Sequence, residues 1–113
     1  MAEKGFLRLV GINCPSELDD EFNRWYNNTH VPLIMKFPRI KKATRAKIDQ
    51  PISDLPQYLA IYEFESRTDF EDWLASPELA AAAKEANETW SEKKYDRIFF
   101  VEYEVVEIWD RDA

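Results

Sequence analysis

The 113 residues suffice for a single domain (residues 1–113), and contents of 45% apolar and 14% aromatic residues exclude a disordered linker. An excess of 22 acidic over 15 basic residues gives a net charge of −7, which opposes binding to nucleic acids and to anionic membranes. The single cysteine, Cys14, allows no disulfide within the chain and lacks a neighbouring metal ligand. The N-terminal apolar run is short and is broken by Arg8, so we expect neither a signal peptide nor a membrane span, and a cytoplasmic location.

The first half of the chain predicts a strand, a helix and then two more strands. Residues 5–13 are short and β-rich and end before a proline, which favours a strand. Ser16-Glu-Leu-Asp predicts a capping box, and residues 18, 22, 25 and 29 recur at helical spacing, so we expect an amphipathic helix that ends at about His30. Residues 40–48 predict a basic strand with one solvated face, 49–57 a loop, and 58–65 a strand.

The second half predicts a helix in two parts and a closing strand. Thr68-Asp-Phe-Glu71 predicts a second capping box, and Ser76-Pro77-Glu78 predicts that the helix breaks and restarts with proline in its first turn. Residues 98–109 predict a long final strand that extends beyond its sheet. The order β-α-β-β-α-β indicates a ferredoxin-like α+β fold, in which two helices cover one face of a four-stranded antiparallel sheet.

The other face of this sheet is predicted to be apolar as well. Along residues 58–65, Leu59 and Ile61 point to one side, whereas Tyr58, Tyr62 and Phe64 point to the other. One helical layer would leave a large apolar patch exposed, so we expect a second copy to cover it in a homodimer that forms a dimeric α/β barrel. The alternative is a monomer. Because so short a chain has little room for an enclosed pocket, a ligand pocket would be easier to build between two chains.

The candidate chemical site surrounds the only histidine. Tyr26 and His30 are four residues apart, which places them on one face of the predicted helix, beside Phe22 and Trp25. At the end of a helix the dipole would favour the imidazolium, and an imidazole that titrates near neutral pH suits a proton shuttle. The alternative is a structural role, in which His30 caps the helix by bonding to a backbone carbonyl.

Several segments resemble EthD-like proteins of the dimeric α/β barrel superfamily. Trp-Tyr-Asn-Asn-Thr-His-Val-Pro at residues 25–32 resembles their W-Y-x-x-x-H-x-P segment, and residues 37–45 resemble V-P-G-F-x-x-A-x-R. Residues 58–63 resemble the central strand of the family, and residues 76–78 the start of its second helix, so the resemblance spans most of the chain. The sequence departs from the family at Arg39, where glycine is usual, and at Ala46, where many members have an aromatic residue. We therefore expect a different pocket entrance.

The resemblance implies that Trp25, Tyr26, His30 and Arg45 face the cavity. Our candidate catalytic residues are His30, Tyr26 and Arg45, and our candidate substrate-binding residues are Trp25, Asn23 and Tyr62. An alternative for Arg45 is an ion pair with a cross-strand acid, Glu63 or Glu65. The fold that the resemblance implies hosts monooxygenases, isomerases, decarboxylases, haem-degrading enzymes and proteins without known activity, so it indicates no single reaction.

Two functions are left open by the sequence. The first is a cofactor-independent enzyme for a small aromatic or polyketide-like molecule, in which His30 exchanges a proton and Tyr26 or Arg45 stabilises an oxyanion. No nucleotide, flavin or metal motif is present, so no cofactor is expected, although a lone histidine can ligate haem. This function predicts that the three residues converge on a cavity of at least about 300 Å³. The second is a non-catalytic homodimeric ligand-binding or accessory protein, in which His30 is bonded away from any cavity.

Overall fold

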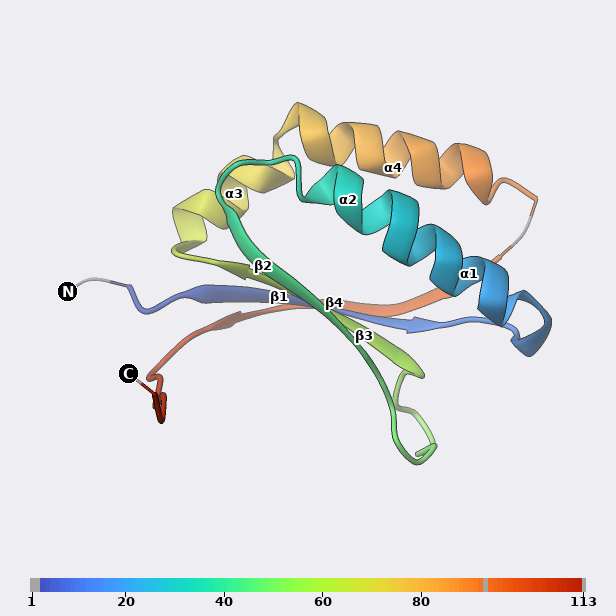
Figure 1. Cartoon of the computed structure of the whole chain (residues 1–113), viewed down its shortest axis with the longest axis horizontal. Coiled ribbons are helices and arrows are strands. Elements are labelled where there is room, and N and C mark those ends of the chain that lie inside the picture. Colours follow the sequence, from blue (N-terminus) through green and yellow to red (C-terminus); the bar gives the residue numbers. More distant parts are fainter. Residues whose placement is uncertain (1–2, 93, 113) are drawn as a thin grey trace.

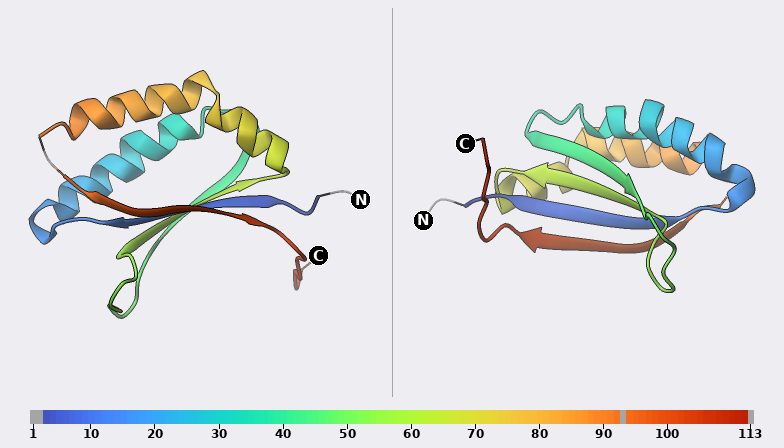
Figure 2. Two further views of the ribbon diagram at one scale, coloured as in Figure 1. Left: turned by 180° about the vertical axis from the view of Figure 1, so that it is seen from behind. Right: turned by 60° about the horizontal axis from the view of Figure 1, so that its bottom comes forward.

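The computed structural model describes residues 3–92 and 94–112, in which a layer of helices covers one face of a four-stranded sheet (Figure 1). The strands are β1 (Phe6–Asn13), β2 (Ile40–Lys47), β3 (Tyr58–Phe64) and β4 (Asp96–Glu104). Their order across the sheet is β2-β3-β1-β4, and every pairing is antiparallel. All helices lie on the same side of the sheet (Figure 2), which confirms the predicted ferredoxin-like α+β architecture.

The first helical segment is continuous but irregular. Its parts are η1 (Ser16–Leu18), a short 3-10 turn, α1 (Asp19–Trp25), η2 (Tyr26–His30), a π-helical turn, and α2 (Val31–Ile34). No side chain caps η1 or α1, so the predicted capping box at Ser16 is wrong. The 3-10 turn, closed by a bond of 3.0 Å from Leu18 N–H to the carbonyl of Pro15, takes the place of the cap.

The helix does not end at His30, because a π turn carries the chain past a proline. In a regular α-helix the ring of Pro32 would clash with the carbonyl four residues earlier. The π turn is wider, and Val31 N–H bonds to the carbonyl of Tyr26 five residues earlier. His30 therefore lies inside a helical segment that continues to Ile34.

The second helical segment is divided, as predicted, at Ser76. The parts are α3 (Arg67–Leu74) and α4 (Pro77–Thr89), and the Ser76 hydroxyl accepts a bond of 3.1 Å from Leu79 N–H at the start of α4. The α3 cap, however, is Ser66, whose hydroxyl accepts from Asp69 N–H at 3.1 Å. The capping box predicted at Thr68 is wrong because that residue is already helical.

None of the described helices has both the length and the apolar character needed to cross a membrane.

The final strand is shorter than predicted. It begins at Asp96 and ends at Glu104 rather than at Trp109. The pairing stops because β1 begins at Phe6, and the last bond of this edge runs from Val105 N–H to the carbonyl of Gly5 at 3.0 Å. Residues 105–112 continue without a neighbouring strand, and Trp109 is 87% exposed.

The inner face of the sheet and the helices enclose an aromatic core. On β3, Tyr58, Ala60, Tyr62 and Phe64 are buried while the alternate residues are half-buried, which confirms the predicted sidedness. Phe22 of α1 is 0% exposed. Its ring lies 5.1 to 6.2 Å, centroid to centroid, from the rings of Trp25, Tyr26, Tyr58, Trp90 and Tyr95.

The outer face of the sheet carries none of the described helices (Figure 1). Leu9 pairs with Ile61 on one side and with Val101 on the other, and all three are only half-buried. A Cβ on Gly11 would lie 2.8 Å from the ring of Phe99 and 2.9 Å from Pro56, so only glycine fits where the β2–β3 loop folds against this face.

Candidate functional site

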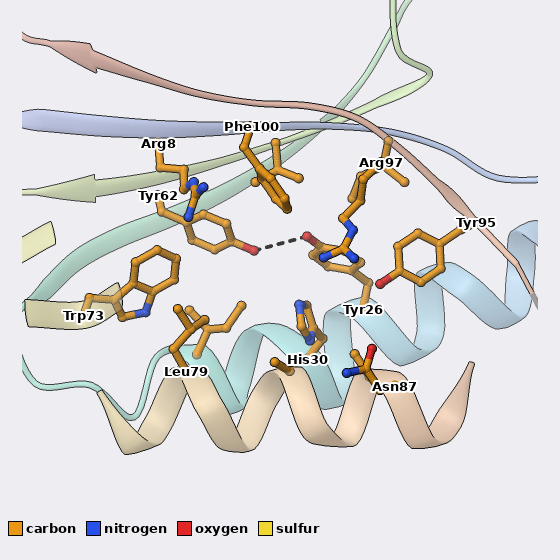
Figure 3. Close-up of a pocket in the computed structure, with 15 residues that line it drawn as sticks. Arg8, Tyr26, His30, Tyr62, Trp73, Leu79, Asn87, Tyr95, Arg97 and Phe100 are labelled. Atoms are coloured by element: carbon orange, nitrogen blue, oxygen red, sulfur yellow. Dashed lines mark hydrogen bonds between the residues drawn. The ribbon is translucent and has the colours of Figure 1, made fainter. Parts of the chain in front are cut away.

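A cavity of about 240 Å³ lies between the helices and the inner face of the sheet (Figure 3). The lining residues are Arg8, Val10, Ile12, Tyr26, His30, Ile34, Tyr62, Trp73, Leu79, Ala83, Ala86, Asn87, Tyr95, Arg97 and Phe100. One chain forms this cavity, although we expected a pocket to be easier to build between two chains. The space exists because the helices leave the β4 edge open, where Phe100 is 48% exposed. The volume is below the predicted 300 Å³.

His30 points from the π turn into this cavity, toward the hydroxyls of Tyr26 and Tyr62 (Figure 3). Its ring stacks on Trp25, with centroids 4.7 Å apart and planes at 24°, and meets Tyr26 edge-on at 4.9 Å. The stack forms because a π turn places residues five apart above one another, whereas the sequence analysis considered only α-helical spacing. Nδ1 is buried without a hydrogen-bond partner among the described residues. The structure gives His30 no helix-capping role.

Burial sets the protonation state of His30. The pKa of the imidazole is lowered to about 4, mainly because burial desolvates the charged form; Glu85 opposes this shift, and Arg97 and Arg45 contribute to it. The imidazole is therefore neutral at pH 7. The helix dipole does not favour the imidazolium here, because the helical segment continues through α2 and His30 is not at its end.

Two tyrosine hydroxyls form the wall opposite His30. Tyr26 Oη and Tyr62 Oη are 3.2 Å apart and buried, and one must donate its hydrogen bond to the other. Burial raises the pKa of both phenols, so both stay protonated near neutral pH. The pair shares one internal hydrogen bond and retains one O–H that is free to donate to a ligand.

Arg45 does not line the cavity. It lies behind Tyr26, with Cζ 4.4 Å from the ring centroid, and Nη1 donates to Asn23 Oδ1 at 2.9 Å and to Asn27 Oδ1 at 2.8 Å. None of the ion pairs among the described residues joins it to Glu63 or Glu65, since the β2 register places it opposite Ala60. Arg45 therefore supports Tyr26 from outside the site.

Asn23 and Trp25 also lie outside the cavity lining. Asn23 Nδ2 donates to Tyr58 Oη at 2.9 Å, within the same polar network as Arg45. Trp25 Nε1 donates to Glu85 Oε1 of α4 at 2.8 Å, which fixes the indole behind the ring of His30. Of the predicted site residues, the structure thus brings Tyr26, His30 and Tyr62 to the cavity.

The departure at Arg39 does not alter the cavity entrance, contrary to our expectation. Among the described residues only Gly5 and Asp54 have positive φ, so Arg39 occupies an ordinary conformation. Its guanidinium contacts α3 instead, with Nη2 2.9 Å from Asp72 and Nη1 3.5 Å from Asp69. Ala46 is exposed on β2 and does not line the cavity either.

Twelve of the fifteen lining residues were not among the predicted site residues, and four of these twelve bear on the chemistry of the cavity. Arg8 lies on the inward face of β1, between Phe6 and Val10. A charged residue among alternating apolar residues could have been recognised in the sequence as a candidate site residue. Trp73 lies on α3, for which the sequence indicated no site residue. Tyr95 and Arg97 lie in a segment without a motif, and only the tertiary fold brings them to the cavity.

A bound metal ion needs a group of side chains that could hold it. No group of three or more potential metal-ligating side chains occurs in residues 3–92 and 94–112. The cavity volume of about 240 Å³ is below the roughly 300–1,000 Å³ that is typical of sites for drug-sized ligands.

The sequence pattern of a family described as "Domain of unknown function (DUF4286)" matches residues 9–107. The chain belongs to the DUF4286 family. No curated protein matches the sequence.

Solved structures with the same fold include an EthD-family protein, a protein of unknown function and a lyase. An EthD-family protein from Bacillus halodurans is 17% identical to this DUF4286 protein, with a TM-score of 0.68 over 89% of this chain and 99% of that one. A dimeric protein of unknown function from Bacteroides fragilis is 18% identical, with a TM-score of 0.62 over 93% and 100%. A hydroxynitrile lyase from Passiflora edulis is 19% identical, with a TM-score of 0.63 over 96% and 99%. This similarity confirms the EthD-like fold, but a shared fold does not assign a reaction.

Proposed function

We propose that this DUF4286 protein is a cofactor-independent enzyme that moves a proton on a small, planar, mostly apolar molecule. The observation that carries the proposal is the neutral imidazole of His30, which points toward two protonated tyrosine hydroxyls across a small cavity. A proton acceptor and an oxyanion donor that face one space are the two groups that enolisation needs.

The proposed reaction starts with a carbonyl compound bound in the cavity. Nε2 of His30 removes a proton from the carbon beside the carbonyl, and the electron pair of that C–H bond moves to form an enolate. The free O–H of the Tyr26–Tyr62 pair donates to the enolate oxygen. The enolate in turn raises the pKa of His30, because opposite charges attract strongly where water is excluded. Return of the proton to the same or a conjugated carbon completes an exchange or an isomerisation.

Deuterium exchange tests this proposal without knowledge of the natural substrate. In D₂O we expect the wild-type protein to exchange the acidic C–H positions of 2-tetralone, a small aromatic ketone, faster than buffer does, as followed by proton NMR. His30→Gln is expected to reduce the rate to that of buffer. Asn28→Gln, a matched change at an exposed position of the same π turn, is expected to keep the wild-type rate. Equal rates for the wild type and His30→Gln contradict the proposal.

A non-catalytic ligand-binding role is the second candidate, and one observation favours it. A catalytic histidine is usually oriented by a hydrogen bond at its second nitrogen, and Nδ1 of His30 has no such partner among the described residues. Binding of 2-tetralone without exchange above buffer would support this role.

We also propose that two chains pair through the outer faces of their sheets. The β2–β3 loop and the C-terminal segment both project on the side away from the helices (Figure 1), and both carry exposed apolar residues. Ile52 is 57% exposed on the loop and Ile108 is 58% exposed on the C-terminal segment. With the apolar strands between them, these segments form a self-complementary face that a two-fold partner would cover. The similar protein from Bacteroides fragilis is described as dimeric.

Ile61→Glu is expected to convert a dimeric wild-type protein to a monomer in sedimentation equilibrium. Ile61 lies on β3 between the partners Leu9 and Thr44, so two-fold pairing would bury the new carboxylate in an apolar interface. Ala80→Glu adds the same charge on the exposed side of α4 and is expected to leave the dimer intact. A monomeric wild type, or a dimeric Ile61→Glu variant, contradicts the proposed interface.

A further inference from the structure

The cavity concentrates positive charge in an acidic protein. The whole chain has a net charge of −7, yet the described lining residues include Arg8 and Arg97 and neither an aspartate nor a glutamate. Arg97 takes part in none of the described ion pairs. A cleft with one sign of charge and apolar walls focuses the potential inside it. The cavity therefore attracts anions, although most of the protein surface repels them.

Arg8 is held in place as a desolvated cation at one end of the cavity. Its side chain is 16% exposed, and Cζ lies 4.5 Å from the ring centroid of Phe100 and 5.9 Å from that of Trp73. Glu102 Oε2 is 3.2 Å from Arg8 Nε, but Nε still lacks an aligned hydrogen bond. A guanidinium fixed between aromatic rings is ready to bind a planar anion.

The same end of the cavity holds two buried donors without an aligned acceptor. Arg8 Nε has only the ion pair with Glu102, and Trp73 Nε1, on a residue that is 2% exposed, has no hydrogen-bond partner in the described part of the chain. Indole and guanidinium nitrogens can only donate, so what this end needs is an acceptor. Buried polar groups in native proteins are nearly always hydrogen-bonded, so a ligand that supplies an acceptor would explain these two donors.

The volume and the remaining lining restrict the rest of the ligand. At ~30 Å³ per water molecule, a cavity of about 240 Å³ corresponds to roughly eight waters. Val10, Ile34 and Leu79 line the space between the arginine end and His30. This is room for one or two apolar rings.

We infer that the ligand of this cavity is a small aromatic carboxylate, whose charged group binds the guanidinium of Arg8 while its rings lie beside His30. Arg97 at the open β4 side draws the anion in. The inference rests on the proposed function because it uses the same cavity, but it requires no proton transfer at His30.

Isothermal calorimetry with 2-naphthoate and 2-naphthamide tests the inference, because the two probes share their rings and differ in charge. We expect the wild-type protein to bind the carboxylate at least about tenfold more tightly than the amide. Arg8→Gln is expected to reduce this ratio to near one. Arg24→Gln removes the same charge from an exposed position of α1, outside the cavity, and is expected to leave the ratio unchanged.

A second variant separates loss of recognition from loss of folding. Glu102→Gln removes the carboxylate that competes for Arg8, so it is expected to tighten 2-naphthoate binding several-fold and to leave 2-naphthamide binding unchanged. An unfolded protein does not bind more tightly. Equal binding of both probes to the wild type overturns the inference and leaves the proposed function standing. Absence of binding by either probe overturns the inference as well, and the exchange of 2-tetralone then decides the proposed function separately.

Discussion

Phe22→Ala is expected to lower the free energy of unfolding by about 3–5 kcal/mol, the range for removal of a fully buried phenylalanine. Phe22 is 0% exposed and its ring contacts aromatic residues from β3, η2 and the end of α4. These large, rigid rings are held by several elements at once and cannot collapse into the space that the ring leaves. The loss is therefore expected at the upper part of this range.

Urea denaturation followed by circular dichroism measures this loss. Phe100→Ala is the matched control, since it removes the same ring from a position that is 48% exposed, and we expect it to cost less than half as much. A loss below about 1 kcal/mol for Phe22→Ala would mean that the helices can repack on the sheet, and the cavity beside Tyr26 would then have no fixed shape.

The order of the elements could be predicted because each strand has its own local signal. The period-two pattern of Tyr58 to Phe64 determines which side chains meet the helices, whatever the rest of the chain does. The helix starts were harder. Ser16, Ser66 and Thr68 all have side chains that can cap a helix. A capping residue must itself have an extended backbone, as Ser66 has with φ −151°, and the sequence does not show which of the three does.

The candidate site could be predicted only where its residues are close in sequence. Tyr26 and His30 lie on one turn, and the sequence brought them together correctly. Arg45 was misplaced, because the strand pattern does not show that β2 is the edge strand farthest from β4, with the cavity on the β4 side. Arg97 was missed for the same reason, since its place follows from the pairing of β4 with β1.

One residue connects the sequence of the first helix to the chemistry of the site. Pro32 is incompatible with a regular α-helix at this point, and the π turn that accommodates it brings His30 onto Trp25. This stack removes water from one face of the imidazole, and Tyr26 covers its edge. Both contacts contribute to the burial that lowers the pKa of His30.

Acidification from pH 6.5 to pH 5 is expected to lower the free energy of unfolding of the wild-type protein by about 1.6 kcal/mol, because His30 is neutral in the folded state. Its pKa is about 4 when folded and near 6.5 when unfolded. Above pH 6.5 neither state binds the proton, so stability does not change. Between the two pKa values only the unfolded state binds it, and stability falls by about 1.4 kcal/mol for each unit of pH. Below pH 4 both states bind it and the contribution is constant.

His30→Gln is the control for this prediction, because it removes the one imidazole that titrates in this pH range. The chain has one histidine, and carboxylates titrate mainly below pH 5, so the variant is expected to show a nearly flat profile from pH 6.5 to 5. Urea midpoints at one fixed protein concentration keep any effect of dimerisation constant. Parallel profiles for the wild type and the variant would mean that the imidazole accepts a proton in the folded state almost as easily as in water. His30 would then be partly charged near neutral pH, and the neutral acceptor that the proposed enolisation requires would be absent.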